Sequence, residues 1–191
     1  MCGRYSFVKS IPDARIAAIV KIMDERYPGS YKTGEIFPGD TVPGIIAKNG
    51  RLAPVPAVFG FSGFEEPKLL INARLETAEQ KKTFAEGMRD KRIVLPASGF
   101  YEWSHDTRKV KYFFSLDHVP VLYLCGIYRL EEGIVRFVIL TREANDSMKD
   151  VHSRMPLIIK PEEVRAYLTD AEEARRILQK ASPFLKKEIA G

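Results

Sequence analysis

The feature that most limits the fold of this chain is a series of short strand-like runs in its middle. Five such runs, separated by proline, glycine or acidic turn residues, cover 93–95, 99–103, 110–116, 121–127 and 134–141. Connections this short favour antiparallel neighbours, because parallel strands need a crossover of about a dozen residues. The sequence therefore predicts a curled, barrel-like antiparallel sheet rather than alternating strand–helix–strand units.

Helical patterns flank this region on both sides. Near the start, Ile16, Ile19, Val20 and Met23 repeat at helical spacing after a Pro-Asp start signal, which predicts an amphipathic helix ending at 27–30. Further helices are expected over 78–90, from 161 and over 171–180, and further strands at 1–7, 42–47, 52–59 and 156–160. With no repeat or linker in the sequence, we expect one α+β domain over residues 1–191, its barrel-like sheet flanked by helices.

Composition excludes several classes of protein. The longest nearly apolar run, 119–128, is far shorter than the ~18 residues that span a bilayer, and we expect neither a membrane partner nor a secretion signal. The 2 cysteines form no CxxC motif, so no disulfide framework, metal or cofactor is expected. The net charge of +5 suits a polyanionic partner. We expect a cytoplasmic protein.

Cys2 is informative because of its position. Removal of Met1 would leave an amine and a thiol on adjacent carbons. Such an aminothiol captures an aldehyde in two steps, since the amine forms a Schiff base and the sulfur then closes a five-membered thiazolidine ring. The alternative is an inert terminal residue. Cys125 lies in an apolar strand and is expected to be an unreactive core residue.

Two pairs of polar residues have the i,i+2 spacing that places side chains on one face of a strand. Asn72 and Arg74 form the first pair, and an amide can position a reacting amine while an arginine binds phosphate. His152 and Arg154 form the second pair. A solvated strand face, or a structural histidine, is the alternative for each. We assign His105 and His118 to structural roles in polar turns.

Glu102 stands among aromatic residues in a Gly-Phe-Tyr-Glu-Trp run. Partial desolvation there would raise the pKa of the carboxyl toward the range useful for proton transfer. The alternative is a structural ion pair with an arginine. Trp103, the single tryptophan, is either a core residue or a stacking surface for a nucleobase.

Four segments taken in order resemble the SRAP (SOS-response-associated peptidase) family. They are Met-Cys-Gly-Arg-Tyr at 1–5, Asn-Ala-Arg-Leu-Glu-Thr at 72–77, Leu-Pro-Ala-Ser-Gly-Phe-Tyr-Glu-Trp at 95–103 and His-Ser-Arg-Met-Pro at 152–156. The resemblance implies the SRAP fold and a protein that acts on abasic sites in the DNA damage response. Such members bind single-stranded DNA and crosslink the ring-opened abasic aldehyde to their N-terminal cysteine as a thiazolidine.

The resemblance also implies roles for individual residues. Cys2 matches the covalent nucleophile, Asn72 the positioning amide, Glu102 the proton shuttle and His152 the assisting acid or base. The residues that fall where members contact DNA are Arg4, Arg74, Trp103 and Arg154. Lyase-type chemistry and self-removal of the residue before Cys2 are implied as well. The expected partner is single-stranded DNA with abasic sites, bound by a monomer that associates with the nucleoid.

Two segments depart from the family pattern. A usual Trp-Gly-Leu-Ile-Pro-like stretch reads Phe-Gly-Phe-Ser-Gly-Phe at 59–64, and a usual Asn-x-Ala-Pro-Thr segment reads Glu-Ile-Phe-Pro-Gly-Asp at 35–40. Both departures leave Cys2, Asn72, Glu102 and His152 unchanged, and they bear on how the chain binds the DNA that flanks the lesion. Two other functions remain open: an N-terminal-nucleophile hydrolase that uses the Cys2 thiolate, and a non-catalytic reader of modified DNA bases.

Overall fold

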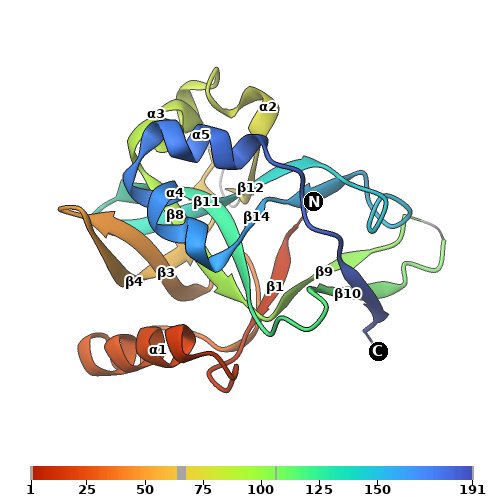
Figure 1. Ribbon diagram of the computed structural model, residues 1–191, viewed down its shortest axis with the longest axis horizontal. Coiled ribbons are helices and arrows are strands. Elements are labelled where there is room, and N and C mark those ends of the chain that lie inside the picture. Colours follow the sequence, from red (N-terminus) through yellow and green to blue (C-terminus); the bar gives the residue numbers. More distant parts are fainter. Residues whose placement is uncertain (1, 64–67, 106, 191) are drawn as a thin grey trace.

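Strands of the larger sheet pair in a closed ring, and Figure 1 shows how the helices surround them. The computed structural model describes residues 2–63, 68–105 and 107–190. Neighbouring strands pair around the ring in the order β12–β4–β3–β8–β11 and back to β12. The bounds of the five are β3 (Thr41–Lys48), β4 (Arg51–Phe59), β8 (Arg92–Ala97), β11 (Leu122–Glu131) and β12 (Ile134–Glu143). The predicted barrel-like α+β fold is confirmed.

Three short strands extend this barrel, and two of its pairings are not antiparallel. The additional strands are β7 (Asn72–Arg74), β13 (Arg154–Pro156) and β14 (Ile158–Ile159). β12 pairs in parallel with both β4 and β7, whereas the other pairings of the barrel are antiparallel. β4 and β7 therefore run in the same direction beside β12, whereas two strands joined by a tight turn are antiparallel.

A second sheet lies against one end of the barrel. Its strand order is β15–β10–β9–β1–β2. The strands are β1 (Arg4–Phe7), β2 (Gly34–Ile36), β9 (Gly99–Trp103), β10 (Lys111–Ser115) and β15 (Lys186–Ile189). The sequence did not predict β15, because its Lys-Lys-Glu-Ile run has no alternation of apolar and polar residues. A small hairpin of β5 (Phe61–Ser62) and β6 (Leu69–Leu70) completes the strands of the described part.

Helices cover two sides of the barrel. α1 (Ala14–Arg26) packs under β3 and β4, whereas α3 (Lys82–Asp90), α4 (Val164–Thr169) and α5 (Ala171–Gln179) gather on the other side (Figure 1). The helix expected over 78–90 is wrong in its bounds: α2 (Leu75–Ala78) ends early, and the extended backbone of Lys81 separates it from α3. The helix expected from 161 begins as a 3₁₀ turn, η1 (Pro161–Glu163), with proline at its first position, where a missing N–H is tolerated.

One continuous set of buried residues joins the two sheets. It extends from Cys2 to Leu185 and includes the stacked rings of Phe59 and Phe137 in the barrel and of Phe100 and Phe114 in the second sheet. Cys125 is fully buried in β11, as predicted. No helix among the described residues is long and apolar enough to cross a membrane.

The junction of the two sheets brings distant segments together. β8 continues into β9 through Ser98, whose backbone N–H donates to the Ser6 carbonyl of β1 (2.8 Å). β9 then pairs with β1, and Arg4 lies opposite Tyr101. The start of the chain is thereby held beside the end of β9, which carries Glu102.

Candidate functional site

Cys2 lies just before β1 and is buried, with 1% of its surface exposed. Its carbonyl accepts a hydrogen bond from Nδ2 of Asn72 (3.1 Å), and the same nitrogen approaches the carbonyl of Ile139 (3.5 Å). The parallel pairing of β7 with β12 sets Asn72 opposite Ile139, so the barrel itself fixes the amide. Oδ1 of Asn72 is buried and has no hydrogen-bond partner among the described residues. The amide therefore has an acceptor left for an incoming group.

Glu102 faces the same space from β9. The residue is 7% exposed, and burial raises the pKa of its carboxyl above the usual value. Burial also raises the pKa of the Cys2 thiol far above its usual range, and the charge of Glu102 raises it further. The carboxyl and the thiol are thus electrostatically coupled, and the thiol is protonated at neutral pH. This confirms the direction that the sequence predicts for the pKa of Glu102.

His152 is held as a neutral ring. Its Nδ1 accepts a hydrogen bond from the backbone N–H of Arg154 (2.9 Å), so the neutral imidazole carries its proton on Nε2. Burial, together with neighbouring positive groups that include His105, lowers the pKa of His152 to about 4. Near neutral pH the ring can donate a hydrogen bond through Nε2.

His105 belongs to this site, although its place in a polar turn predicts a structural role. Its ring lies 4.7 Å from that of His152, centroid to centroid, and its charge also acts on the carboxyl of Glu102. The available signal was the short distance in sequence, since His105 follows Glu102 by three residues and lies just after β9 ends at Trp103. His118, by contrast, lies exposed beside Asp117.

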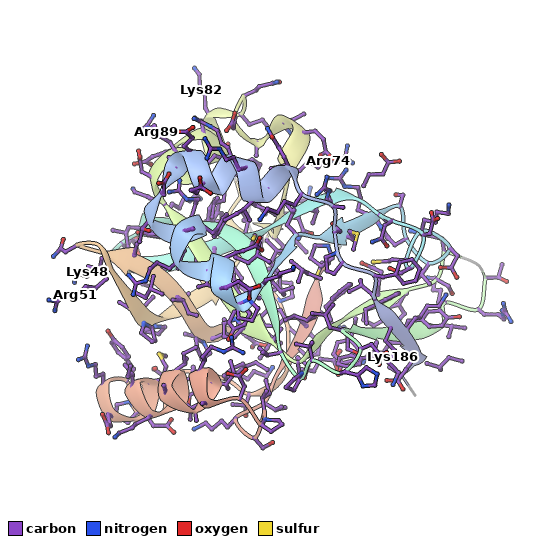
Figure 2. The ribbon with its side chains drawn as sticks, in the orientation of Figure 1. Lys48, Arg51, Arg74, Lys82, Arg89 and Lys186 are labelled. Carbon is purple, nitrogen blue, oxygen red and sulfur yellow. The ribbon has the colours of Figure 1, made fainter. Side chains whose placement is uncertain are left out.

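The arginines expected to contact DNA have different surroundings. Both terminal nitrogens of Arg154 bind the carboxylate of Glu76 (2.8 Å each), and one also donates to the carbonyl of Thr141 (2.7 Å). These bonds lower the pKa of Glu76 and tie α2 to the barrel. Arg74 is exposed at the end of β7 and points outward, as Figure 2 shows. Contact with DNA stays a prediction for both.

An open hollow of about 460 Å³ leads from the surface toward Glu102. The guanidinium of Arg4 lies between two aromatic rings there, 4.2 Å from the centre of Phe37 and 4.8 Å from that of Trp103. Trp103 is therefore a wall of the hollow rather than a core residue. The lining residues are Gly3, Arg4, Phe37, Pro38, Glu102 and Trp103.

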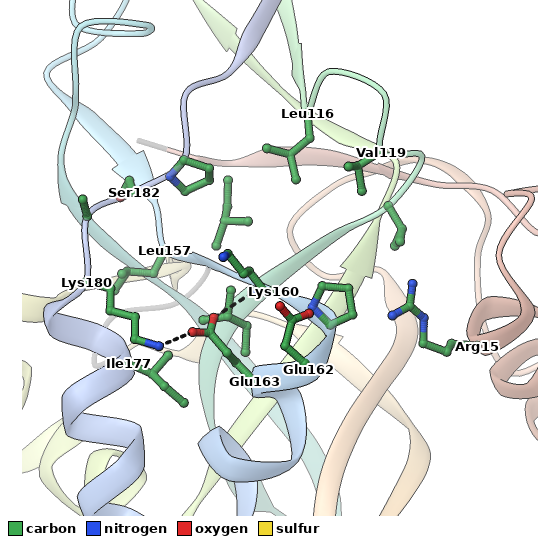
Figure 3. Close-up of a pocket in the computed structure, with 16 residues that line it drawn as sticks. Arg15, Leu116, Val119, Leu157, Lys160, Glu162, Glu163, Ile177, Lys180 and Ser182 are labelled. Atoms are coloured by element: carbon green, nitrogen blue, oxygen red, sulfur yellow. Dashed lines mark hydrogen bonds and ion pairs between the residues drawn. The ribbon is translucent and has the colours of Figure 1, made fainter.

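Other features of the described residues lie apart from this site. A cavity of about 590 Å³ opens beside β14 and the end of α5 (Figure 3). Its walls are mostly aliphatic, and on its rim Lys180 pairs with Glu163. The labelled lysines and arginines of Figure 2 are distributed around the molecule rather than gathered in one patch. No group of histidine, cysteine or acidic side chains in this part of the chain is arranged to hold a metal ion.

Fold and site together define an α+β barrel protein in which buried polar side chains gather around Cys2. The chain belongs to the SRAP family, because the model of the family described as SOS response associated peptidase (SRAP) matches residues 1–190. The four segments that resemble this family supply Cys2, Asn72, Glu102 and His152, all of which lie around this site.

Curated relatives and solved structures agree with this assignment. The abasic site processing protein YoqW of Bacillus subtilis (strain 168) is 31% identical over 94% of this chain and 87% of its own length. The abasic site processing protein YedK of Escherichia coli (strain K12) is 28% identical over 88% of this chain and 79% of its own. A phage-related protein from Bordetella bronchiseptica has a similar structure, with a TM-score of 0.74, 25% identity and coverage of 99% and 94%.

Proposed function

We propose that this chain processes abasic sites in single-stranded DNA by a covalent thiazolidine link to Cys2. The observation that carries the proposal is the hydrogen bond from the Asn72 amide to the Cys2 carbonyl, beside the Glu102 carboxyl. An amide fixed in this way orients the amino end of Cys2 toward the remaining groups of the site. The names of the curated relatives support the same substrate.

The reaction begins with a free amine on Cys2. The Met1–Cys2 peptide bond is hydrolysed, with consumption of one water; Met1 itself lies outside the described residues. The amine then attacks C1′ of the ring-opened deoxyribose, and the carbinolamine loses water to give an imine. Glu102 suits both steps, because a carboxyl of raised pKa can donate a proton to the departing oxygen and accept one from the amine.

Sulfur closes the ring in the last step. The thiol attacks the imine carbon, a C–S bond forms, and the thiol proton passes to the nitrogen, so that the whole condensation releases one water and needs no oxidant. Because burial keeps the Cys2 thiol protonated, the amine reacts first and the thiol reacts only when the imine is beside it. Ring closure then removes the imine that would otherwise promote strand breakage by β-elimination.

His152 and the arginines have supporting parts in this proposal. The neutral ring of His152 presents its Nε2–H to the opening sugar as a hydrogen-bond donor. Arg4, Arg74 and Arg154 and the net charge of +5 favour the DNA backbone, and Trp103 offers a ring face to a base. Such a protein would act in the cytoplasm at the nucleoid.

The mass of the intact protein after mixing with an abasic oligonucleotide tests the proposal. We expect the mass of the chain without Met1 plus the oligonucleotide minus one water. Cys2→Ser should give little stable adduct, whereas Cys125→Ala, which removes the other thiol, should crosslink like the wild type. A processed wild type that gains no oligonucleotide would refute the proposal, and turnover of peptides instead would favour the N-terminal-nucleophile hydrolase.

A further inference from the structure

The segment 35–40, which departs from the family pattern, builds one wall of the hollow beside Cys2. We propose that Glu35 is a specificity-determining residue that competes with the DNA backbone for two cations, Arg4 in the lining of the hollow and Lys111 on β10. Affinity for undamaged strands is thereby lowered, and retention on DNA depends on the covalent step. The inference rests on the proposed function, since it concerns how the same site selects its substrate.

Glu35 holds two cations from two other strands. Its Oε1 lies 3.2 Å from Nη1 of Arg4 on β1, and both of its carboxylate oxygens lie 3.0 Å from Nζ of Lys111 on β10. The three side chains are about one-quarter to one-third exposed, so solvent screens the pairs only in part. A carboxylate on β2 thus offsets the positive charges of Arg4 on β1 and Lys111 on β10 in the same sheet.

Aromatic rings hold the same cations in place. Arg4 lies between Phe37 and Trp103, and Lys111 lies 4.2 Å from the ring centre of Tyr101 and 5.6 Å from that of Trp103. Both cations therefore have aromatic contacts that do not involve Glu35. The carboxylate accepts hydrogen bonds from Nη1 of Arg4 and Nζ of Lys111 and offsets their charge.

This arrangement has a direct consequence for a phosphate that approaches the hollow. The phosphate meets two cations that already share a carboxylate, and it has to displace Glu35 or accept repulsion from it. Arg4 and Glu102 line the same hollow, so Glu35 weakens the binding of any DNA strand that enters it. An abasic strand overcomes the weaker grip through its bond to Cys2, whereas an undamaged strand dissociates.

Binding to an undamaged strand isolates this effect from the chemistry. The probe is a fluorescein-labelled oligothymidylate, and its anisotropy is measured over a range of NaCl concentrations with wild type and Glu35→Gln. We expect Glu35→Gln to bind about three- to tenfold more tightly, and the slope of log K against log salt to steepen by about 0.7–1.4, the value for one or two additional phosphate contacts on a single strand.

Glu131→Gln is the matched control. Glu131 also bridges two cations, since it pairs with Arg129 (2.6 Å) and Arg136 (3.2 Å), but it lies at the end of β11 in the barrel. The substitution removes the same unit of negative charge away from the hollow. We expect its affinity for oligothymidylate to change by less than about twofold, as for a remote charge screened by salt.

The outcomes separate this inference from the proposed function. The inference is supported if Glu35→Gln, but not Glu131→Gln, binds oligothymidylate more tightly and with a steeper salt slope. It is also supported if an excess of oligothymidylate lowers the crosslinking of abasic DNA more for Glu35→Gln than for wild type. Equal effects of the two variants, weaker binding by Glu35→Gln, or no binding by either protein would overturn it. If wild type fails to crosslink abasic DNA while Glu35→Gln still binds oligothymidylate more tightly, the covalent chemistry is wrong and the role of Glu35 stands.

Discussion

At the scale of single residues, Glu102 has opposite effects on stability and on chemistry. Burial raises the pKa of its carboxyl, so the folded state favours the protonated form, and stability is lost as the pH rises through the folded pKa. Glu102→Gln, a neutral side chain of the same shape, should raise the melting temperature at pH 7 by a few degrees. The same change should slow crosslinking about a hundredfold, because proton transfer is removed.

Calorimetry and a time course on denaturing gels measure the two effects. The comparison at pH 4 is the control, because protonated Glu102 and glutamine are both neutral there and the two melting temperatures should converge. A variant that is less stable than wild type at pH 7 would show that the ionised carboxylate stabilises the fold.

His152 gives a second pH-dependent prediction, with the opposite sign. Its pKa is lowered to about 4 from 6.5, so between these values the unfolded chain binds a proton that the folded chain does not. Stability contributed by the neutral ring is therefore complete above pH 6.5 and falls as the pH decreases toward 4. His152→Gln should flatten this decline in urea unfolding followed from pH 7 to pH 4.5. An unchanged slope would mean that folding does not lower the pKa of His152.

The residues of the site were predictable to different degrees. Asn72 and Glu102 stand in motifs whose residue types already indicate their chemistry, and the structure brings both to Cys2. For His105 the sequence offered only its short distance from Glu102, because its contact with His152 depends on how the chain after β9 meets the residues before β13. Pairing of Arg4 and Lys111 with Glu35 likewise joins residues far apart in the sequence.

At the scale of elements, β9 depends on a close approach to β10. A Cβ at Gly99 would lie 2.3 Å from Cζ of Phe113 and 2.5 Å from the backbone oxygen of Phe114. The carbonyl cannot move without disturbing the strand pair, so Gly99→Ala should lower the free energy of unfolding by about 1–3 kcal/mol. Crosslinking should also slow, because β9 carries Glu102. Urea unfolding and the gel assay provide the measurements.

Gly133→Ala is the control for this prediction. Gly133 has φ +81° in the turn between β11 and β12, with no atom within 4 Å of the added Cβ. The substitution should cost about 1 kcal/mol through backbone strain alone and leave crosslinking unchanged. Equal losses of crosslinking in the two variants would show that the packing of β9 is not what positions Glu102.

Among the elements, those with a clear periodicity were predictable and those defined by their partners were not. The runs that became β3, β4, β8, β11 and β12 were recognised within a few residues, because each is apolar and bounded by turn residues. β15 has four exposed residues and exists because β10 offers it a free edge. The parallel pairings of β12 could not be predicted from local pattern either, since they join β12 to strands more than 60 residues earlier in the sequence.

At the scale of the whole molecule, the buried residues that join both sheets imply that barrel and second sheet unfold together. Phe137 is fully buried and stacks on Phe59 at 5.0 Å where β12 meets β4, so Phe137→Ala should cost about 3–5 kcal/mol. Trp103, the single tryptophan, lies in the second sheet and reports on that sheet by its fluorescence.

Wild type and Phe137→Ala are therefore compared by urea unfolding, with Trp103 fluorescence and far-ultraviolet circular dichroism as the two probes. If residues 1–191 form one cooperative domain, as the sequence predicts, both probes move to the same lower midpoint although the substitution lies in the barrel. Fluorescence that keeps the wild-type midpoint while the dichroism shifts would divide the chain into two units. Cys2 and Trp103 would then remain ordered after the barrel, which carries Asn72, had unfolded.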